Sequence, residues 1–254
     1  MLKPSKGQLK FWAGLDLGKN RHREGRFLAE GVKVVREALR SSWNIDHFLV
    51  RGDKAELWQS LLPAMSGKAI YELSESEWKK ISQDKESEGV AAVIAKPLML
   101  PVRDVIPGNH KHILLLYQIS NPLNLGAILR STHWFGVKTV LLSEGSVDFT
   151  HPKVVRSSMG SLFHLQLYDD VDFRELLPHL KKDRFVISTS VLGGIPPHFV
   201  DKPSVVLLGS ESHGLPEELQ ALTDECWCIP RIGDAESLSL PQAAAIIVYE
   251  WTKE

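Results

Sequence analysis

The second half of this 254-residue chain alternates between apolar runs of strand length and helical patterns, and this alternation limits the possible folds most. Runs rich in Val, Ile and Leu cover residues 113–118, 137–142, 185–190 and 205–209. Helical patterns cover residues 171–180 and 242–251. Parallel strands need crossover helices and are buried on both faces, so this pattern is typical of a mainly parallel sheet covered by helices. We therefore predict an α/β fold.

A segment rich in proline precedes this half. Three prolines interrupt every regular period there: Pro97, Pro101 and Pro107. Because proline breaks both helices and strands, we predict a linker over 97–110 between a first domain, 1–96, and a second domain, 111–254. One helical and two strand patterns predict that the first domain is a small α/β unit: 30–39, 45–50 and 90–95.

The composition excludes several classes of protein. Hydrophobic residues make up 43% of the chain, enough for a substantial core. No run approaches the ~18 apolar residues of a membrane span, and the first ten residues lack the apolar run of a signal peptide, so we expect a cytoplasmic protein without a membrane partner. The two cysteines, Cys226 and Cys228, are too few for a disulfide framework or a four-ligand zinc site. We read them as small apolar residues on one face of a buried strand, and we expect no metal.

The net charge of −1 conceals a basic cluster in the first domain. Four basic residues lie within eight positions: Lys19, Arg21, Arg23 and Arg26. Such runs are usually solvated surface, but they are also the kind of cluster that binds nucleic-acid phosphates. Composition alone leaves both readings open.

Polar segments follow several of the predicted strands, where open α/β sheets place their ligands. The first segment is 121–130, in which Asn124 is expected to cap a helix that ends at Gly136. A buried stripe is predicted for that helix: Leu125, Ile128, Leu129 and Thr132. Gly126 and Arg130 are four residues apart, so we expect them to share the opposite face. An exposed arginine on a helix is the alternative.

Two further segments carry polar turns. In 208–216, Gly209 and Gly214 bracket a turn that exposes backbone N–H groups to a ligand. Ser212 and His213 are adjacent in it, but a serine hydrolase would need a nucleophile elbow that this sequence lacks. In 228–241 a strand end and a long turn lead to a helix that begins near Pro241. Because residues 243–248 of that helix are apolar on every face, we expect it to be buried all round, in part by a second subunit.

Together these segments resemble the three signature motifs of the SpoU (TrmH-type) family of RNA 2′-O-ribose methyltransferases. The matching residues are Asn124, Gly126 and Arg130 with Phe135 and Gly136; Gly209, Ser210 and Glu211 with Gly214 and Leu215; and Ile229 and Pro230 with Ser237 and Leu238. The segment 154–163 is also similar to the family's sequence between the first two motifs. Residues 23–31 and 89–93 resemble the RNA substrate-binding domain, ribosomal-protein-like in fold, that many members carry. This makes RNA phosphate the favoured partner of the basic cluster.

The resemblance implies a parallel-sheet SPOUT domain with a trefoil knot, which no periodicity could reveal, and S-adenosylmethionine as cofactor. It implies cofactor contacts from the loops at Thr189, Gly209, Ile229 and Leu238. It also implies a catalytic group: Asn124, Arg130, Glu211 and Ser239. Since a guanidinium is protonated throughout the physiological range, we favour phosphate binding over base action for Arg130. The family's members pair through helices beside the knot, so a homodimer through the second domain is expected.

Two residues depart from the family pattern. Ser239 stands where asparagine is usual, and Asn121 stands where aspartate is frequent before the first proline. These departures leave a non-catalytic RNA-binding paralogue as the alternative to an RNA 2′-O-ribose methyltransferase. Ribosomal and transfer RNA are equally open as substrates at this point.

Overall fold

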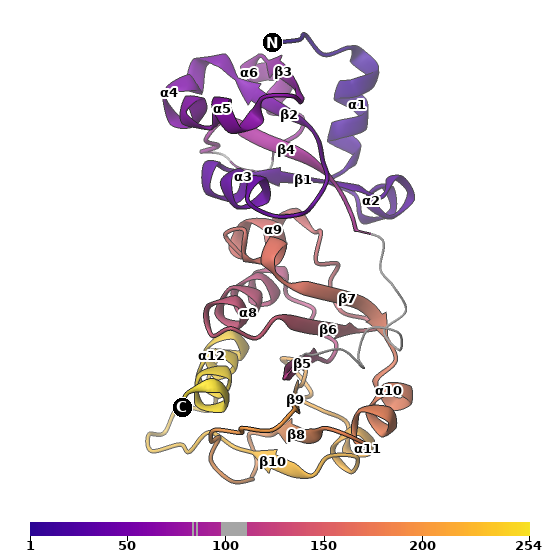
Figure 1. Cartoon of the computed structure of the whole chain (residues 1–254), viewed down its shortest axis with the longest axis vertical. Coiled ribbons are helices and arrows are strands. Elements are labelled where there is room, and N and C mark those ends of the chain that lie inside the picture. The colour runs from indigo at the N-terminus through magenta and orange to yellow at the C-terminus, as the bar shows by residue number, and fades with distance from the viewer. Residues whose placement is uncertain (83, 85, 98–110) are drawn as a thin grey trace. The chain divides into compact units, whose positions relative to one another are not determined.

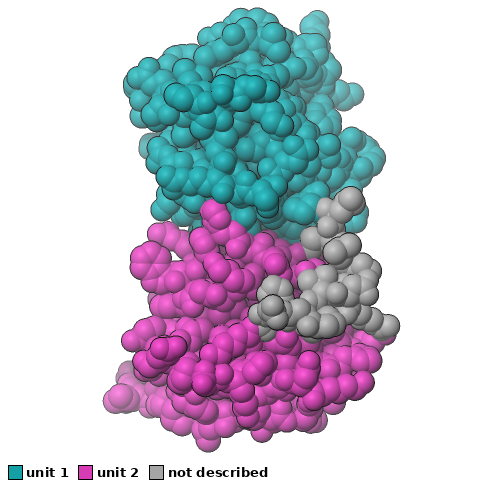
Figure 2. Space-filling model, viewed as in Figure 1, with its two compact units in different colours: residues 1–98, 148–163 teal, residues 99–147, 164–254 magenta. Residues whose placement is uncertain are grey.

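The computed structural model describes residues 1–82, 84, 86–97 and 111–254. It forms two compact units, one of residues 1–98 with 148–163 and the other of residues 99–147 with 164–254 (Figure 2). Residues 148–163 therefore pack in unit 1, although they lie within the range that the sequence pattern assigned to the second domain. Apart from Pro97, the predicted linker 97–110 lies outside the described residues.

Unit 1 is built on a four-stranded sheet in the order β1-β4-β2-β3. Its strands are β1 (Arg26–Glu30), β2 (Ile45–Arg51), β3 (Ala69–Leu73) and β4 (Val90–Ala95). Strand β4 is antiparallel to both β1 and β2, whereas β2 and β3 are parallel. The strands predicted over 45–50 and 90–95 are confirmed, and β1 and β3 are additional.

Short helices surround this sheet. They are α1 (Lys6–Gly14), α2 (Gly18–Glu24), α3 (Val32–Leu39), α4 (Ala55–Trp58), α5 (Leu62–Met65), α6 (Glu75–Trp78) and α9 (Pro152–Ser157), with 3₁₀ turns at Gly52–Lys54, Gln59–Leu61 and Ser161–His164. The helix predicted over 30–39 is α3, but it begins at Val32 because Glu30 ends β1 and Gly31 has a φ of 108°. Its buried residues are Val34, Val35 and Ala38.

The segment 148–163 is held in unit 1 by aromatic packing and one close approach. Trp43 meets Phe149 and Phe163 edge to face, at centroid distances of 6.4 and 5.3 Å. Gly160 has a φ of 86°, and a Cβ there would lie 2.5 Å from the Cβ of Glu37 on α3. Only glycine combines this backbone with so close a neighbour.

Unit 2 contains a six-stranded sheet in the order β10-β8-β9-β5-β6-β7, and all its pairings are parallel. Its strands are β5 (His112–Leu116), β6 (Thr139–Ser143), β7 (Gln166–Val171), β8 (Phe185–Thr189), β9 (Ser204–Leu208) and β10 (Glu225–Trp227). The predicted parallel sheet is thus confirmed, with the four predicted strands shifted by no more than two residues at either end.

Helices cover both faces of this sheet. α8 (Pro122–Trp134) and α12 (Leu240–Thr252) lie on one face, and α10 (Phe173–Leu180) and α11 (Glu217–Gln220) lie on the other (Figure 1). Alternate strand residues point to opposite faces, so Ile113 and Leu115 of β5 join the core under α10 and α11. Among the described residues, the structure contains no helix with both the length and the hydropathy of a membrane span.

One expectation about burial is corrected, and one stays a prediction. Within one chain, helix α12 leaves Ile246 and Tyr249 39% and 48% exposed, so its burial all round depends on the expected second subunit, whereas Ile247 is only 4% exposed and belongs to the core of its own chain. Cys226 and Cys228 are only half-buried. The side chain that β10 buries is Trp227, because it is the largest apolar group of the strand and alternates with the cysteines.

Candidate active site

The site lies where the chain reverses its progress across the sheet of unit 2. From β5 the chain goes to β6 and β7 on one side, while β9, β8 and β10 occupy the other side. The connections that leave the neighbouring strands β5 and β9 therefore go to opposite sides of the sheet, and the carboxyl ends of such a strand pair are where open α/β sheets bind ligands. Residues 117–121, after β5, lead into the first motif segment, 121–130, and residues 209–214, after β9, belong to the second, 208–216.

Asn121, rather than Asn124, caps helix α8. The Oδ1 atom of Asn121 accepts a hydrogen bond from the N–H of Leu123 at 2.9 Å, and Pro122 takes the first helical position. The expectation for Asn124 was wrong because proline at the first turn fixes the start three residues earlier than the asparagine pattern indicated. The predicted stripe of Leu125, Ile128, Leu129 and Thr132 is buried, and Gly136 ends the helix with a φ of 83°.

The carboxylate of Glu211 accepts hydrogen bonds from the residues at the start of α8. It accepts hydrogen bonds from Asn124 Nδ2 at 3.0 Å, from the N–H of Asn121 at 3.4 Å, and from the N–H and hydroxyl of Ser120 at 3.4 and 3.5 Å. A carboxylate is favoured at a helix N-terminus because free N–H groups and the helix dipole face it. The first and second motif segments are thus joined by one acidic side chain.

Gly209 fixes the shape of the turn that carries Glu211. A Cβ on Gly209 would lie 2.2 Å from the carbonyl carbon of Gly214, so no other residue fits. Ser210 and Gly214 exchange two backbone hydrogen bonds, of 3.1 and 3.0 Å, and the N–H of His213 donates to Ser210 Oγ at 3.2 Å. Ser212 and His213 are exposed at the tip of this turn, which is not the strand-to-helix elbow of a hydrolase.

Arg130 lies two turns along α8 and is exposed. Within the described part of the chain its side chain makes no hydrogen bond or ion pair, so its planar set of N–H donors is available to an anion. Gly126, predicted on the same face, is buried instead. The exposed guanidinium suits phosphate binding, whereas a buried, paired arginine would be structural.

The loops after β8 and β10 follow strands that lie beyond β9 in the same sheet. Thr189 Oγ1 donates to the carbonyl of Leu207 at 2.8 Å, which fixes the end of β8 against β9. The loop that follows runs beside β10: Ile195 accepts from Cys228 at 2.9 Å and donates to Cys226 at 3.0 Å. At Gly194, where φ is 143°, a Cβ would lie 2.5 Å from the carbonyl oxygen of Cys226.

The segment 229–238 is suited to hold a ligand through its backbone. In the part of the chain that the structure describes, it makes no backbone-to-backbone hydrogen bond, and Leu238 exposes 47% of its surface. Ile229, at the start of the segment, is half-buried. The carbonyls of Ile229 and Ala235 accept from Cys228 Sγ at 3.7 Å and from Arg231 Nη1 at 3.4 Å. Backbone groups outside any backbone ladder, beside apolar side chains, fit the polar edges and flat faces of a nucleoside.

Ser239 occupies the position before the first residue of α12. Its hydroxyl donates to Gln242 Oε1 at 3.0 Å and its N–H to the same atom at 3.3 Å.

Of the four predicted catalytic residues, only Asn124 and Glu211 are in direct contact. Sequence reasoning did not identify Ser120, whose two donors face Glu211. The signal that could have identified it is its position: it is a polar residue just after β5, where the chain reverses its direction across the sheet.

The basic cluster of unit 1 does not act as one surface. Arg21 is 4% exposed and its guanidinium is bound to protein oxygens, so the prediction that it contacts RNA phosphate is corrected. Arg26 pairs with Asp46 at 2.5 Å, and Arg23 pairs with Glu24 at 2.7 Å while staying largely exposed. Lys19 is exposed. Lys19 and Arg23 are therefore the members best placed to bind an anion.

Comparisons with known proteins cover both units. A sequence model described as the SpoU rRNA Methylase family matches residues 111–249, and one described as an MRM3-like substrate binding domain matches residues 6–92. The 23S rRNA (guanosine(2553)-2′-O)-methyltransferase RlmP of Bacillus subtilis is 29% identical over 95% of this chain and 94% of its own length.

Solved structures agree with this likeness. An RNA methyltransferase of the TrmH family from Porphyromonas gingivalis has a TM-score of 0.84 at 30% identity, with 99% of both chains covered. The SpoU methyltransferase AviRb from Streptomyces viridochromogenes, solved in complex with AdoMet, has a TM-score of 0.85 at 26% identity, with 97% of both chains covered.

Proposed function

The chain belongs to the SpoU rRNA Methylase family and is an S-adenosylmethionine-dependent RNA 2′-O-ribose methyltransferase, and we propose that its substrate is ribosomal rather than transfer RNA. The contact of Asn124 with Glu211 at 3.0 Å carries the assignment of the site, because it joins two separate motif segments at the reversal of the sheet. Ribosomal RNA is favoured by the B. subtilis relative, which matches almost the whole of this chain. Such a substrate points to the cytoplasm as the working compartment.

The residues of unit 2 can supply what the reaction needs besides the methyl group. A ribose hydroxyl is a weak nucleophile, so the enzyme must hold it in line with the methyl donor and assist loss of its proton. When bound, the cofactor supplies an electrophilic methyl group on a sulfonium. The loops at Thr189, Gly209, Ile229 and Leu238 would hold it.

We assign Arg130 to the RNA. Its guanidinium is exposed and free to bind a phosphate beside the target ribose, which would fix the sugar in position. Glu211 has a different task, since it fixes Asn124 and the turn at Ser120. Ser239 would stabilise the start of α12 beside the cofactor loop through its hydrogen bond to Gln242.

The departure at Asn121 does not favour the non-catalytic alternative. Its Oδ1 atom caps α8, which is the task that an aspartate at that position could perform equally. Asn121 is therefore compatible with an active methyltransferase. We further propose that α12 and the preceding loop form the trefoil knot that the resemblance implies.

We also propose a homodimer through unit 2. Helices α8 and α12 pack together, and three large apolar side chains on them are exposed: Trp134 at 83%, Ile246 at 39% and Tyr249 at 48%. Apolar side chains grouped on adjacent helices of a folded unit are typical of an interface. A second copy of the same helices would cover them.

The substrate can be tested with purified protein and RNA from cells that lack the gene. We expect transfer of labelled methyl groups to ribosomal RNA at one ribose, which mapping of 2′-O-methyl positions would locate. RNA from cells that carry the gene serves as the control, because its site is already methylated. Methylation of transfer RNA alone would overturn the choice of substrate, and cofactor binding without transfer to any RNA would favour the non-catalytic alternative.

A further inference from the structure

Gln118, two residues after the end of β5 in unit 2, has a backbone conformation that is costly for its residue type. Its φ is 50°, in the left-handed region, where the Cβ atom of any residue but glycine is crowded. Among the residues that the structure describes, Met159 and Asp170 are the others besides glycine with a positive φ. Aspartate bears this conformation at lower cost, because its short polar side chain can hydrogen-bond locally. Glutamine lacks that advantage, so glycine would occupy position 118 more favourably.

Hydrogen bonds from the loop after β6 hold Gln118 in this conformation. Ser143, which is only 4% exposed, accepts through its Oγ atom from the N–H of Gln118 at 2.8 Å. Ser146 Oγ accepts from the N–H of Ile119 at 3.3 Å, and the N–H of Val147 donates to the carbonyl of Ile119 at 2.8 Å. A residue in a sparsely populated backbone region persists only where its surroundings fix it, and such residues are concentrated at functional sites. The position of residue 118 is therefore fixed by contacts within unit 2.

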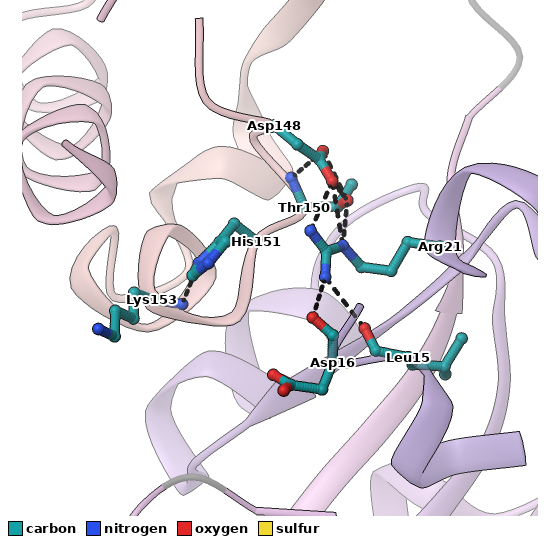
Figure 3. A network of polar contacts seen from close by, with 7 residues as sticks. All are labelled: Leu15, Asp16, Arg21, Asp148, Thr150, His151 and Lys153. Carbon is teal, nitrogen blue, oxygen red and sulfur yellow. Dashed lines mark hydrogen bonds and ion pairs between the residues drawn. The ribbon is translucent and has the colours of Figure 1, made fainter. Parts of the chain in front are cut away.

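The side chain of Gln118 is placed, but its carboxamide is not used. It lies against the loop after β6, since a Cβ on Gly145 would be 3.6 Å from Gln118 Cγ and 3.8 Å from its Nε2. The residue is exposed, and within the described ranges its carboxamide makes no hydrogen bond. Arg21 in unit 1 is the opposite case, because each of its three guanidinium nitrogens donates to protein oxygens, among them those of Asp148 and Thr150 (Figure 3). The two N–H donors and the acceptor oxygen of Gln118 are thus available to a ligand.

Gln118 lies beside the residues that form the candidate active site. Two residues span at most about 7 Å, so its Cα atom is within that distance of Ser120, whose N–H and hydroxyl donate to Glu211. Glu144, next to Gly145, is exposed and forms no ion pair with a described residue. A carboxylate repels phosphate, whereas carboxylate and carboxamide groups both hydrogen-bond to the edges of bases. This part of the sheet edge therefore suits a base rather than the RNA backbone.

We propose that Gln118 recognises a base at the methylation site, either that of the modified nucleotide or that of its immediate neighbour. Proteins bind unpaired RNA bases through hydrogen bonds to their edges, and a glutamine carboxamide can form two such bonds with one base. This role explains why glutamine rather than glycine occupies a left-handed turn. Gln118 determines specificity and takes no part in the transfer itself. The proposal rests on the function given above, since it requires an RNA substrate.

The test compares two left-handed residues at the carboxyl edge of the same sheet. Gln118→Gly removes the carboxamide and relieves the backbone, and Asp170→Gly, the matched control, does the same near the end of the edge strand β7. Gln118→Asn keeps the carboxamide on a shorter side chain. The substrates are RNA fragments that contain the mapped methylation site, with each of the four bases in turn at that nucleotide and at its two neighbours. Each full-length variant is assayed for kcat/KM on every fragment, the Kd of S-adenosylmethionine and the free energy of unfolding.

We expect Gln118→Gly to lower kcat/KM on the natural fragment by about ten-fold, at the lower end of the discrimination that one bidentate base contact provides. At one of the three positions the preference for the natural base should disappear, and Gln118→Asn should retain part of it. The Kd of S-adenosylmethionine should stay unchanged. The free energy of unfolding should be unchanged or higher, because the relief of strain at least offsets the larger entropy of glycine in the unfolded chain. Asp170→Gly should keep both the rates and the base preference.

The dependence on the base separates recognition from a structural role. A distorted turn would lower the rate on every fragment equally, whereas loss of a base contact lowers it on the natural base alone. An equal loss on all fragments, an unchanged preference in Gln118→Gly, or the same loss in Asp170→Gly would overturn the proposal.

Binding to single-stranded homopolymers of the four bases provides a readout that needs neither methyl transfer nor a known site. We expect the wild type to bind one homopolymer more tightly than the others and Gln118→Gly to lose that preference. If the wild type transfers no methyl group to any RNA, the proposed function fails, and these affinities still decide whether Gln118 recognises a base. Equal affinities of the two proteins for all four homopolymers refute the proposal.

Discussion

The polar clusters around Arg21 and around Glu211 contrast in burial and in how far their hydrogen-bonding groups are used. Arg21 is buried in unit 1, and protein oxygens accept from each of its three guanidinium nitrogens. Glu211 and Arg130 of unit 2 are exposed, and among the residues that the structure describes Arg130 has no hydrogen-bond or ion-pair partner. A charge that is buried with all its partners stabilises one conformation, whereas an exposed and unsatisfied one is available to a ligand. Burial and hydrogen-bond partners thus distinguish a structural arginine from a functional one, although the two cannot be told apart in the sequence.

Replacement of the unsatisfied arginine should have the largest effect. We expect Arg130→Ala to lower the rate of methyl transfer by about 100- to 1000-fold, the usual effect of losing one preorganised donor to a charged group. The Kd of S-adenosylmethionine and the free energy of unfolding should stay as in the wild type, because the side chain is exposed. Single-turnover assays and calorimetry would measure these quantities.

The matched replacement Arg130→Lys keeps the charge but loses the planar set of donors. We expect it to restore only part of the rate, since lysine cannot bind a phosphate through two parallel hydrogen bonds. A loss of cofactor affinity in either variant would instead place Arg130 at the cofactor.

The buried arginine should behave in the opposite way. Arg21→Ala leaves Asp148 without its cation, and we expect the free energy of unfolding to fall by about 2–3 kcal/mol, below the range for fully buried pairs because Asp148 is partly exposed to solvent. Denaturant unfolding followed by tryptophan fluorescence would measure it. A stable Arg21→Ala variant would show that the network contributes little to the fold.

The same pair predicts a dependence on pH. Because the folded state lowers the pKa of Asp148, its contribution is complete above the ordinary pKa of an aspartate, 3.8, and is lost as the pH falls through the lower folded value. The wild type should therefore lose more stability in acid than Asp148→Asn does. Parallel acid titrations of the two proteins would check this.

Much of unit 2 could be predicted from the sequence. Its central strands are continuous apolar runs, because both faces of a parallel sheet are buried, and the stripe of α8 follows a helical period. The short strand β10 was less evident, because its single core residue, Trp227, lies between two half-buried cysteines. The start of α8 was misplaced because Asn121 and Asn124 are both good caps, and only the proline between them decides.

The candidate site was predicted in its residues but not in its contacts. Asn124 and Glu211 are 87 positions apart, and only the order of the strands brings them together. The burial of Arg21 could not be predicted from the residues next to it in the sequence, because its partners Asp148 and Thr150 lie 127 and 129 positions further along the chain. A basic run has the same composition whether its members are exposed or buried, so burial was the missing information.

An exposed residue of α12 and an exposed residue of unit 1 together test the proposed dimer. We expect Ile246→Asp to weaken the proposed dimer by about ten-fold or more while the fold is kept, because the side chain is exposed in one chain and would be covered in two. Sedimentation at several concentrations would measure it. Leu57→Asp, at an exposed leucine of unit 1, is the control and should not change the association. Monomeric wild-type protein with full activity would contradict the dimer.

The smallest effects are expected from the exposed members of the basic cluster. Replacing Lys19 and Arg23 together by Ala should weaken RNA binding to all sequences alike and reduce the slope of log K against log salt by about 1 to 2, since each phosphate contact releases close to one counterion. Arg23 is 71% exposed in its side chain, and its pairing with Glu24 is weak enough to be exchanged for a phosphate. Filter binding between low and moderate salt would give the slope. His22→Ala, in the same helix and exposed, is the control. If the double variant keeps the wild-type slope, RNA meets another face of unit 1, and the contrast between Arg21 and its exposed neighbours concerns stability alone.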